Sequence, residues 1–240
     1  MGDGPAWAGH RLLHGRHAGP RADQNRPMET AGGPRLKTLN LALQGGGSHG
    51  AFTWGVLDAL LADRRIGLEG LSGASAGAVN AVALASGWAT ARGEPRVGAR
   101  ETLARVWDEI GSWGSLGALQ ARLGRALWGG GTGAEWVEPT LWTQAFSGLI
   151  SPYQANPLDL NPLRELLQRR IDFAAIRRPG APRVFASATH VATGKAVVFT
   201  GAALTLEAVV ASACLPTLFQ AVRIEGQAYW DGGYAVNPPL

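Results

Sequence analysis

Two short glycine-rich motifs, each placed directly after an apolar stretch, constrain this chain more than any other feature. The first is Gly45-Gly46-Gly47-Ser48-His49-Gly50, and the second is Gly73-Ala74-Ser75-Ala76-Gly77. The second has the G-x-S-x-G pattern, in which a serine sits on a strained turn between a strand and a helix and exposes its hydroxyl. Small flanking residues let two backbones pass close to each other at such a turn. The motifs therefore predict two strand-loop-helix units, with Ser75 as a nucleophile.

The composition fits one globular α/β domain, which we assign to residues 37–240. The chain has 240 residues, of which 46% are hydrophobic and 17% are charged, and this is enough for a sizeable core. Its single cysteine, Cys214, excludes an intramolecular disulfide and gives no sign of an oxidising compartment. We therefore expect a cytoplasmic protein.

Residues 1–36 differ from the rest of the chain. They are rich in Gly, Pro and Arg and hold three of the five histidines, His10, His14 and His17. They contain no apolar run of the length of a signal peptide or a membrane anchor. We expect a disordered, basic and solvated arm here rather than a metal site.

The charge of the chain favours an anionic partner only weakly. The formal net charge is +4 and the isoelectric point is near 9.8. Lys and Arg are scattered and form no stripe with interleaved aromatic residues, so nucleic acid is not expected. A peripheral, lightly attractive membrane surface is the favoured partner.

Hydrophobic periodicity predicts further strands and helices along the chain. One helix follows each glycine motif, and a last one runs from Thr205, its N-cap, to before Pro216. Asn161 as N-cap and Pro162 as first residue begin another helix. The predicted strands cover residues 39–43, 67–72, 183–189, 196–200, 222–224 and 228–230, and two of the predicted helices cover residues 98–112 and 162–170.

The stretch from Ser112 to Asn156 has no sustained period. It contains Gly129-Gly130-Gly131 and the tryptophans at positions 113, 128, 136 and 142. A long irregular stretch in a compact domain is usually functional, such as a lid or a binding loop. An irregular cap that packs its tryptophans into the core is an equally good interpretation.

The two motifs together supply most of an acyl-transfer site, which needs a nucleophile, a base and donors for an oxyanion. Consecutive glycines at positions 45 to 47 can point their amide groups into one concavity at a helix N-terminus. A rival interpretation exists, because Gly45-x-Gly47-x-x-Gly50 after a strand is also a dinucleotide-binding fingerprint, with Glu69 near the place of a ribose-binding acid. The second motif argues against it, because a dinucleotide-binding domain does not require a glycine-bracketed serine.

Elimination points to Asp231 as the base. A triad in the chain order Ser, Asp, His, as in the α/β-hydrolases, does not fit this sequence. His190 is the only histidine after Ser75, and no histidine follows the last acid. His190 falls in a predicted strand, where a structural role is expected. Among the acids after Ser75, Asp231 alone is followed by two consecutive glycines, Gly232-Gly233, which let another backbone approach.

In these residues the chain resembles the patatin-like phospholipase family, over about residues 38–240. Residues 45–50 resemble the family's oxyanion loop, with Gly45, Gly46 and Gly47 as the oxyanion hole and Gly50 in support. Residues 73–77 resemble its nucleophile elbow, with Gly73 and Gly77 in support, and Asp231-Gly232-Gly233 resembles its catalytic-acid motif. Ser212 and Pro216, before Phe219, resemble the run ahead of that acid.

The resemblance implies a three-layer α/β/α fold with a central, mostly parallel sheet. It also implies hydrolysis of carboxylic esters of lipids by a Ser75–Asp231 dyad, with no cofactor and no metal. A catalytically silent membrane-binding scaffold is the alternative from another class, beside the dinucleotide-binding domain. The sequence departs from the family's pattern at two places. His49 stands where the family usually has Arg or Lys. The chain also ends soon after Asn237-Pro238-Pro239, which suggests a fragment.

Overall fold

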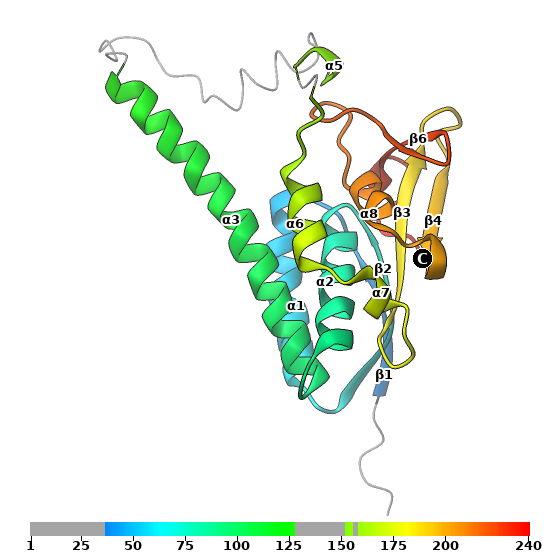
Figure 1. The fold of residues 1–240 in the computed structure, drawn as a ribbon. Helices are drawn as coiled ribbons and strands as arrows, with labels where there is room; N and C mark the ends of the chain where they lie inside the picture. The colour runs from blue at the N-terminus through cyan, green and yellow to red at the C-terminus, as the bar shows by residue number, and fades with distance from the viewer. Residues whose placement is uncertain (1–36, 128–151, 156–157) are drawn as a thin grey trace, which may run out of the picture. The chain divides into compact units, whose positions relative to one another are not determined.

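The computed structural model describes residues 37–127, 152–155 and 158–240 (Figure 1). The predicted N-terminal arm, residues 1–36, lies outside the described residues. So do Trp128, Trp136 and Trp142, on which the prediction of a lid depends.

The core of the fold is a mixed sheet. Its first three strands are parallel neighbours in chain order, and the last three pair in the antiparallel sense. In the described part of the chain the first strand pairs with the second alone and so lies at an edge of the sheet. Leu39 and Leu41 are therefore only half-buried, whereas the sequence predicts a buried strand. The strands are β1 (Lys37–Leu43), β2 (Ile66–Ala74), β3 (Arg183–His190), β4 (Ala196–Thr200), β5 (Val222–Ile224) and β6 (Gln227–Asp231).

Strand β3 connects the two halves of the sheet, because its edges bind different partners along its length. One edge pairs with β4. The other edge pairs first with β2, which ends with Ala74 opposite Ser187. It then pairs with β6, which ends with Asp231 opposite Ala188. Strands β2 and β6 therefore run toward each other and meet end to end at adjacent positions of β3.

The helices confirm the predicted α/β fold. Helices α1, α2, α3 and α6 gather on one side of the sheet in Figure 1, and these two layers account for two of the three predicted ones. On β2, the Ser72 hydroxyl donates to the Pro239 carbonyl at 2.5 Å, which fixes the C-terminal segment. The helices are α1 (Gly50–Ala62), α2 (Ala76–Thr90), α3 (Pro95–Leu127), α5 (Pro152–Ala155), α6 (Pro162–Arg170), α7 (Phe173–Ile176) and α8 (Leu206–Ser212), with 3-10 turns η1 (Gly47–His49), η2 (Gly201–Ala203) and η3 (Gly232–Tyr234).

Most predicted helix boundaries are confirmed, and one is wrong. The Asn161 and Thr205 side chains cap α6 and α8 by accepting hydrogen bonds from the amides of Arg164 and Ala208. The predicted loss of order after Ser112 is wrong for residues 112–127, because α3 continues through them. Leucines recur there at helical spacing despite the glycines between them, at positions 116, 119, 123 and 127.

Helix α2 forms the centre of the core. All its residues from Ala76 to Gly87 are buried, and most of them are Ala, Gly or Val. Such small side chains let the helix pack closely against β2 on one side and α3 on the other. Since α2 begins one residue after Ser75, this packing also fixes the direction in which the helix leaves the serine turn.

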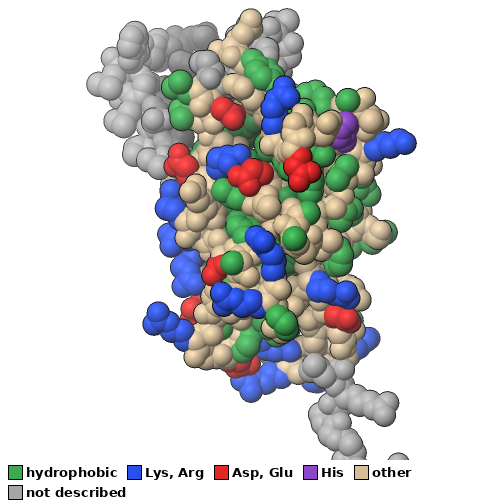
Figure 2. All heavy atoms as spheres, turned by 45° about the vertical axis from the view of Figure 1, so that its right-hand side comes forward, with side chains coloured by type: hydrophobic (Ala, Val, Ile, Leu, Met, Phe, Trp, Pro, Cys, Tyr) green, Lys and Arg blue, Asp and Glu red, His purple; other side chains and the backbone are tan. Residues whose placement is uncertain are grey.

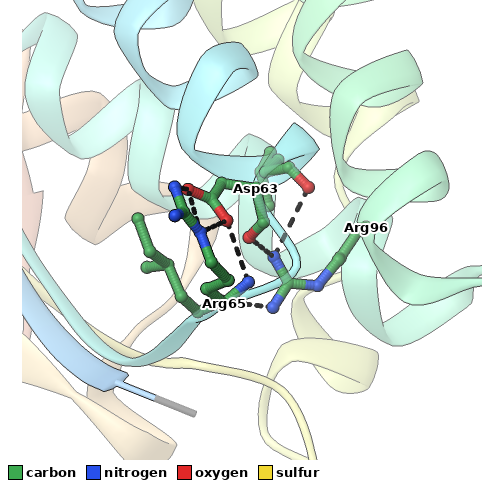
Figure 3. A network of polar contacts seen from close by, with 5 residues as sticks. Asp63, Arg65 and Arg96 are labelled. Atoms are coloured by element: carbon green, nitrogen blue, oxygen red, sulfur yellow. Dashed lines mark hydrogen bonds and ion pairs between the residues drawn. The ribbon is translucent and has the colours of Figure 1, made fainter. Parts of the chain in front are cut away.

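The turn between α1 and β2 is held by charged side chains (Figure 3). Arg96, at the start of α3, donates to the backbone carbonyls of Leu61 and Asp63 at 3.4 and 3.1 Å. It also donates to the carbonyl of Ile66. Hydrogen bonds from the Arg65 guanidinium and backbone amide lower the pKa of Asp63 to about 2. These contacts lie at the start of β2, whereas Ser75 follows its other end.

On the face drawn in Figure 2, Lys and Arg side chains are spread among acidic and hydrophobic ones. Some charged side chains pair between elements, as Arg100 of α3 does with Asp58 of α1 at 2.7 Å. None of the described helices combines the length and the apolar character that crossing a bilayer requires.

Candidate active site

Ser75 lies on the sharp turn that joins β2 to α2. Its φ and ψ angles are 53° and −126°, a combination that residues other than glycine rarely adopt. Backbone strain of this kind costs about 1–3 kcal/mol and persists only where the surrounding structure enforces it. The turn holds the serine between the two elements, with its side chain half-buried.

Close contacts enforce the turn. A Cβ atom on Gly77 would lie 2.0 Å from the Leu43 carbonyl oxygen, and one on Gly73 would lie 2.4 Å from the Gly77 carbonyl carbon. The Ser75 amide donates to the Ser212 hydroxyl at 3.0 Å and to the Ser212 carbonyl at 3.1 Å. Ser212 is fully buried at the end of α8. Its role at the serine turn is not deducible from its sequence context, which only resembles a family pattern.

The glycine loop after β1 is pressed against this turn. A Cβ atom on Gly45 would lie 2.8 Å from the Ser75 Cβ. Gly47 has a φ of +58°, which favours glycine. No described group accepts a hydrogen bond from the amides of Gly46 or Gly47, whereas the Gly45 amide donates to the Asn237 Oδ1 at 2.6 Å. Of the three glycines of the predicted oxyanion hole, Gly46 and Gly47 thus have free amides, whereas Gly45, which is expected to shape the turn, has its amide bound to Asn237.

His49 follows the loop and contacts it. Its Nδ1 lies 3.1 Å from the Gly46 carbonyl oxygen, and its backbone amide donates to the same oxygen at 3.2 Å. Because a carbonyl only accepts, the ring contact requires a proton on Nδ1. His49 thus supports the loop by hydrogen bonding.

A buried polar pair anchors the helix that follows the loop. The Asn80 side chain, on α2, donates to the Gly50 carbonyl at 3.0 Å and accepts from the Trp107 Nε1 at 2.7 Å. A Cβ atom on Gly50 would lie 2.6 Å from the Trp107 ring. The predicted supporting role of Gly50 thus has a steric reason. Asn80 carries no motif that would identify it from the sequence.

Asp231 ends β6 and is held on several sides. Its amide donates to the Cys214 carbonyl at 2.8 Å, and its own carbonyl accepts from the Thr189 hydroxyl at 2.8 Å. The Gly233 amide donates to the carboxylate Oδ1 at 2.7 Å. A Cβ atom on Gly232 would lie 2.1 Å from the Ser187 carbonyl oxygen, so glycine is needed directly after the acid.

The carboxylate of Asp231 is almost completely buried, with 3% of the residue exposed. Burial raises the pKa of Asp231, and the Ser75 hydroxyl and the Gly233 amide counteract part of that rise. Oδ2 has no hydrogen-bond partner within the described residues. The Ser75 hydroxyl therefore lies close enough to the carboxylate to lower its pKa, although no hydrogen bond joins it to Oδ2.

A single pocket of about 430 Å³ brings these groups together. Strand geometry explains this, because the end of β2 and the end of β6 meet at adjacent positions of β3. The pocket is lined by Gly45, Gly46, Gly47, Ser75, Leu215, Asp231, Gly233, Tyr234 and Asn237. A nucleophile, a buried carboxylate and free backbone amides in one pocket are the parts that acyl transfer needs.

Two residues considered in the sequence lie elsewhere. His190 ends β3, outside the pocket, and its ring nitrogens lie 3.1 Å from the Gln227 Oε1 and 3.1 Å from the Thr193 Oγ1. Glu69 lies in the middle of β2, where its carboxylate pairs with Arg183 at 3.4 Å. A ribose-binding acid would be expected beside the glycine loop, so the position of Glu69 does not fit the dinucleotide fingerprint.

Comparison with known proteins assigns the chain to a family. The family model described as patatin-like phospholipase matches residues 41–240, which include both glycine motifs and Asp231. No curated protein matches the chain at a significant level. Since the family model covers most of the sequence, the chain belongs to the patatin-like phospholipase family.

Proposed function

We propose that this protein is a serine esterase that cleaves carboxylic ester bonds of lipids, phospholipids among them, with a Ser75–Asp231 dyad. Membership of a family of phospholipases indicates a lipid acyl hydrolase. The observation that supports the finer proposal is the meeting of β2 and β6 at adjacent positions of β3, because Ser75 follows the end of β2 and the buried Asp231 ends β6. None of the described residues that line the pocket is a histidine, so Asp231 is the base that the geometry supports.

The proposed reaction has two halves. The Ser75 Oγ attacks the ester carbonyl carbon while Asp231 takes the hydroxyl proton, and the Gly46 and Gly47 amides bind the oxyanion. The carbon–oxygen bond to the alcohol then breaks, and the alcohol leaves with the proton from Asp231. Water next gives a proton to Asp231 and attacks the acyl-enzyme, after which Ser75 regains its proton and the fatty acid leaves. Every proton is carried by these groups and water, so the scheme includes no cofactor or metal.

A fluorophosphonate probe tests this function directly, because it reacts only with an activated serine. We expect the wild-type protein to be labelled, and peptide mass spectrometry to find the label on Ser75. His190→Gln should be labelled at the wild-type rate, since His190 lies outside the pocket. An unlabelled but folded wild-type protein would support a silent scaffold instead.

We further propose that this enzyme is cytoplasmic and works at a membrane surface. Leu215 and Tyr234 line the pocket and are 37% and 60% exposed, and Leu218, one turn beyond Leu215, is 54% exposed. Apolar side chains at the mouth of a pocket favour contact with lipid. The net charge of +4 adds a weak attraction to anionic headgroups.

The Leu218→Ser variant is expected to bind vesicles about 5–20-fold more weakly, because burying one leucine contributes roughly 1.5–3 kcal/mol at most and only part of it is inserted. Sedimentation with vesicles of phosphatidylcholine and phosphatidylglycerol measures this. Hydrolysis of a short soluble ester should be unchanged. Val198→Ser is the matched control, since Val198 is 47% exposed but belongs to β4 and not to the turn that carries Leu215. Equal weakening by both variants would contradict a specific lipid-facing rim.

A further inference from the structure

Asn237 makes a two-point contact with the glycine loop across a long stretch of sequence. Its Oδ1 accepts a hydrogen bond from the Gly45 amide at 2.6 Å, and its Nδ2 donates to the Gly45 carbonyl at 3.2 Å. The side chain lines the same pocket as Ser75 and Asp231. It therefore ties the segment that follows the catalytic acid to the loop that carries the free amides.

This contact determines the orientation of a peptide group. The Gly45 carbonyl and the Gly46 amide belong to one planar trans peptide, so they point in opposite directions. Holding the carbonyl with the Asn237 Nδ2 therefore fixes the direction of the Gly46 N–H. The next peptide is held in the same way, because the Gly46 carbonyl accepts from His49, and this fixes the direction of the Gly47 N–H.

We propose that Asn237 is a positioning residue, which aims the Gly46 amide at the oxyanion and couples the glycine loop to the segment of Asp231. This inference rests on the proposed function, since an oxyanion forms only if the site performs acyl transfer. Donors of this kind act because they are oriented before the reaction begins. Loss of the Asn237 contact frees the Gly45–Gly46 peptide to rotate.

The C-terminal segment has anchors that do not depend on Asn237. The Val236 and Ala235 amides donate to the Gly232 carbonyl at 3.0 and 3.1 Å. The Ser72 hydroxyl donates to the Pro239 carbonyl at 2.5 Å. Removing the Asn237 side chain should therefore leave the segment in place, which separates positioning of the loop from general stability.

The test compares Asn237→Ala with Ser72→Ala, which removes a hydrogen bond of the same segment without touching the loop. For Asn237→Ala we expect kcat on a short soluble ester to fall about 10–100-fold, because a misplaced donor loses much of its effect on the transition state. KM should change less than about threefold, since the contact acts on the transition state. The rate of phosphonylation of Ser75 should fall in parallel with kcat. Ser72→Ala should retain wild-type kcat.

The isosteric Asn237→Asp variant isolates the contact with the Gly45 carbonyl. An ionised carboxylate still accepts from the Gly45 amide but has no proton to donate to the carbonyl, so kcat should fall at least as far as in Asn237→Ala. This variant also serves if the alanine variant does not fold.

Three results would overturn the inference while leaving the proposed function intact. They are a wild-type kcat in Asn237→Ala, a wild-type kcat in Asn237→Asp, and an equal loss of kcat in Ser72→Ala. A folded wild-type protein that neither hydrolyses esters nor reacts with the fluorophosphonate would overturn both.

Discussion

Replacement of Ser75 by alanine is expected to lower ester hydrolysis by at least about a thousand-fold, because the reaction then has no nucleophile and no acyl-enzyme can form. Steady-state hydrolysis of a soluble ester and of mixed micelles measures the loss. The effect should be the same on both substrates, since Ser75 acts on the ester carbon and not on the lipid surface. Retention of more than about a tenth of the wild-type rate would contradict the assignment of the nucleophile.

The Ser75→Gly variant separates loss of catalysis from loss of structure. Both variants lack the hydroxyl, but only glycine relieves the strained backbone at φ 53° and ψ −126°. Relief of such strain should make Ser75→Gly about 1 kcal/mol more stable than Ser75→Ala in urea unfolding. Both variants should be equally inactive. A glycine variant that is less stable than the alanine variant would indicate that the turn is not strained.

The serine turn and the glycine loop could be predicted from the sequence because their geometry depends on near neighbours. Gly73 and Gly77 are required where α2 leaves β2 and passes the end of β1, and Gly47 is required by its own positive φ. A glycine pattern records such local steric needs directly. The pairing of Asp231 with Ser75 is predicted only by elimination and by resemblance to a family motif, because it depends on β6 joining the edge of β3 where β2 ends.

The side chains that support the site could not be predicted. Ser212, Asn80 and Asn237 each bond a backbone group that is 30 or more residues away in the sequence. A serine or asparagine forms hydrogen bonds in many contexts, so its type does not indicate its partner. Only the tertiary fold determines which amide or carbonyl it meets.

The length of α3 shows a different limit. Gly111, Gly114, Gly117 and Gly124 lower the helix propensity of its second half. The leucines at positions 116, 119, 123 and 127 keep the helical spacing through this region. This short leucine pattern is the signal that the prediction of an irregular stretch after Ser112 missed, and the intrinsic propensity of single residues is only a weak preference.

Replacement of Asp231 by asparagine is expected to lower kcat by about a thousand-fold or more, nearly as much as the loss of Ser75. Asparagine keeps an acceptor for the Gly233 amide, which donates at 2.7 Å in the wild type, but an amide cannot take the hydroxyl proton. His190→Gln is the control and should retain activity within a few-fold. An inactive His190→Gln variant with a normal circular dichroism spectrum would instead support a mechanism that depends on histidine.

The raised pKa of Asp231 also predicts how activity depends on pH. The carboxylate must be ionised to act as a base, so kcat/KM should fall as the pH is lowered through the pKa of Asp231. Burial raises this pKa, so the fall should occur above the usual range for an aspartate, which is centred at about 3.9. A pH profile of soluble ester hydrolysis measures it, and activity that persists down to pH 4 would contradict a buried aspartate base.

The same pKa predicts that Asp231→Asn stabilises the fold while it abolishes catalysis. A carboxyl group whose pKa is raised by folding favours the folded state while it is protonated, and this contribution is lost as the pH rises through the folded-state pKa. At neutral pH the wild type therefore carries the unfavourable burial of a charge, whereas the asparagine variant is neutral at every pH. We expect the variant to have the higher Tm at pH 7, and the difference to vanish toward about pH 4, where the unfolded-state aspartate also becomes protonated. A Tm difference that is independent of pH would show that it arises from packing and not from the charge of Asp231.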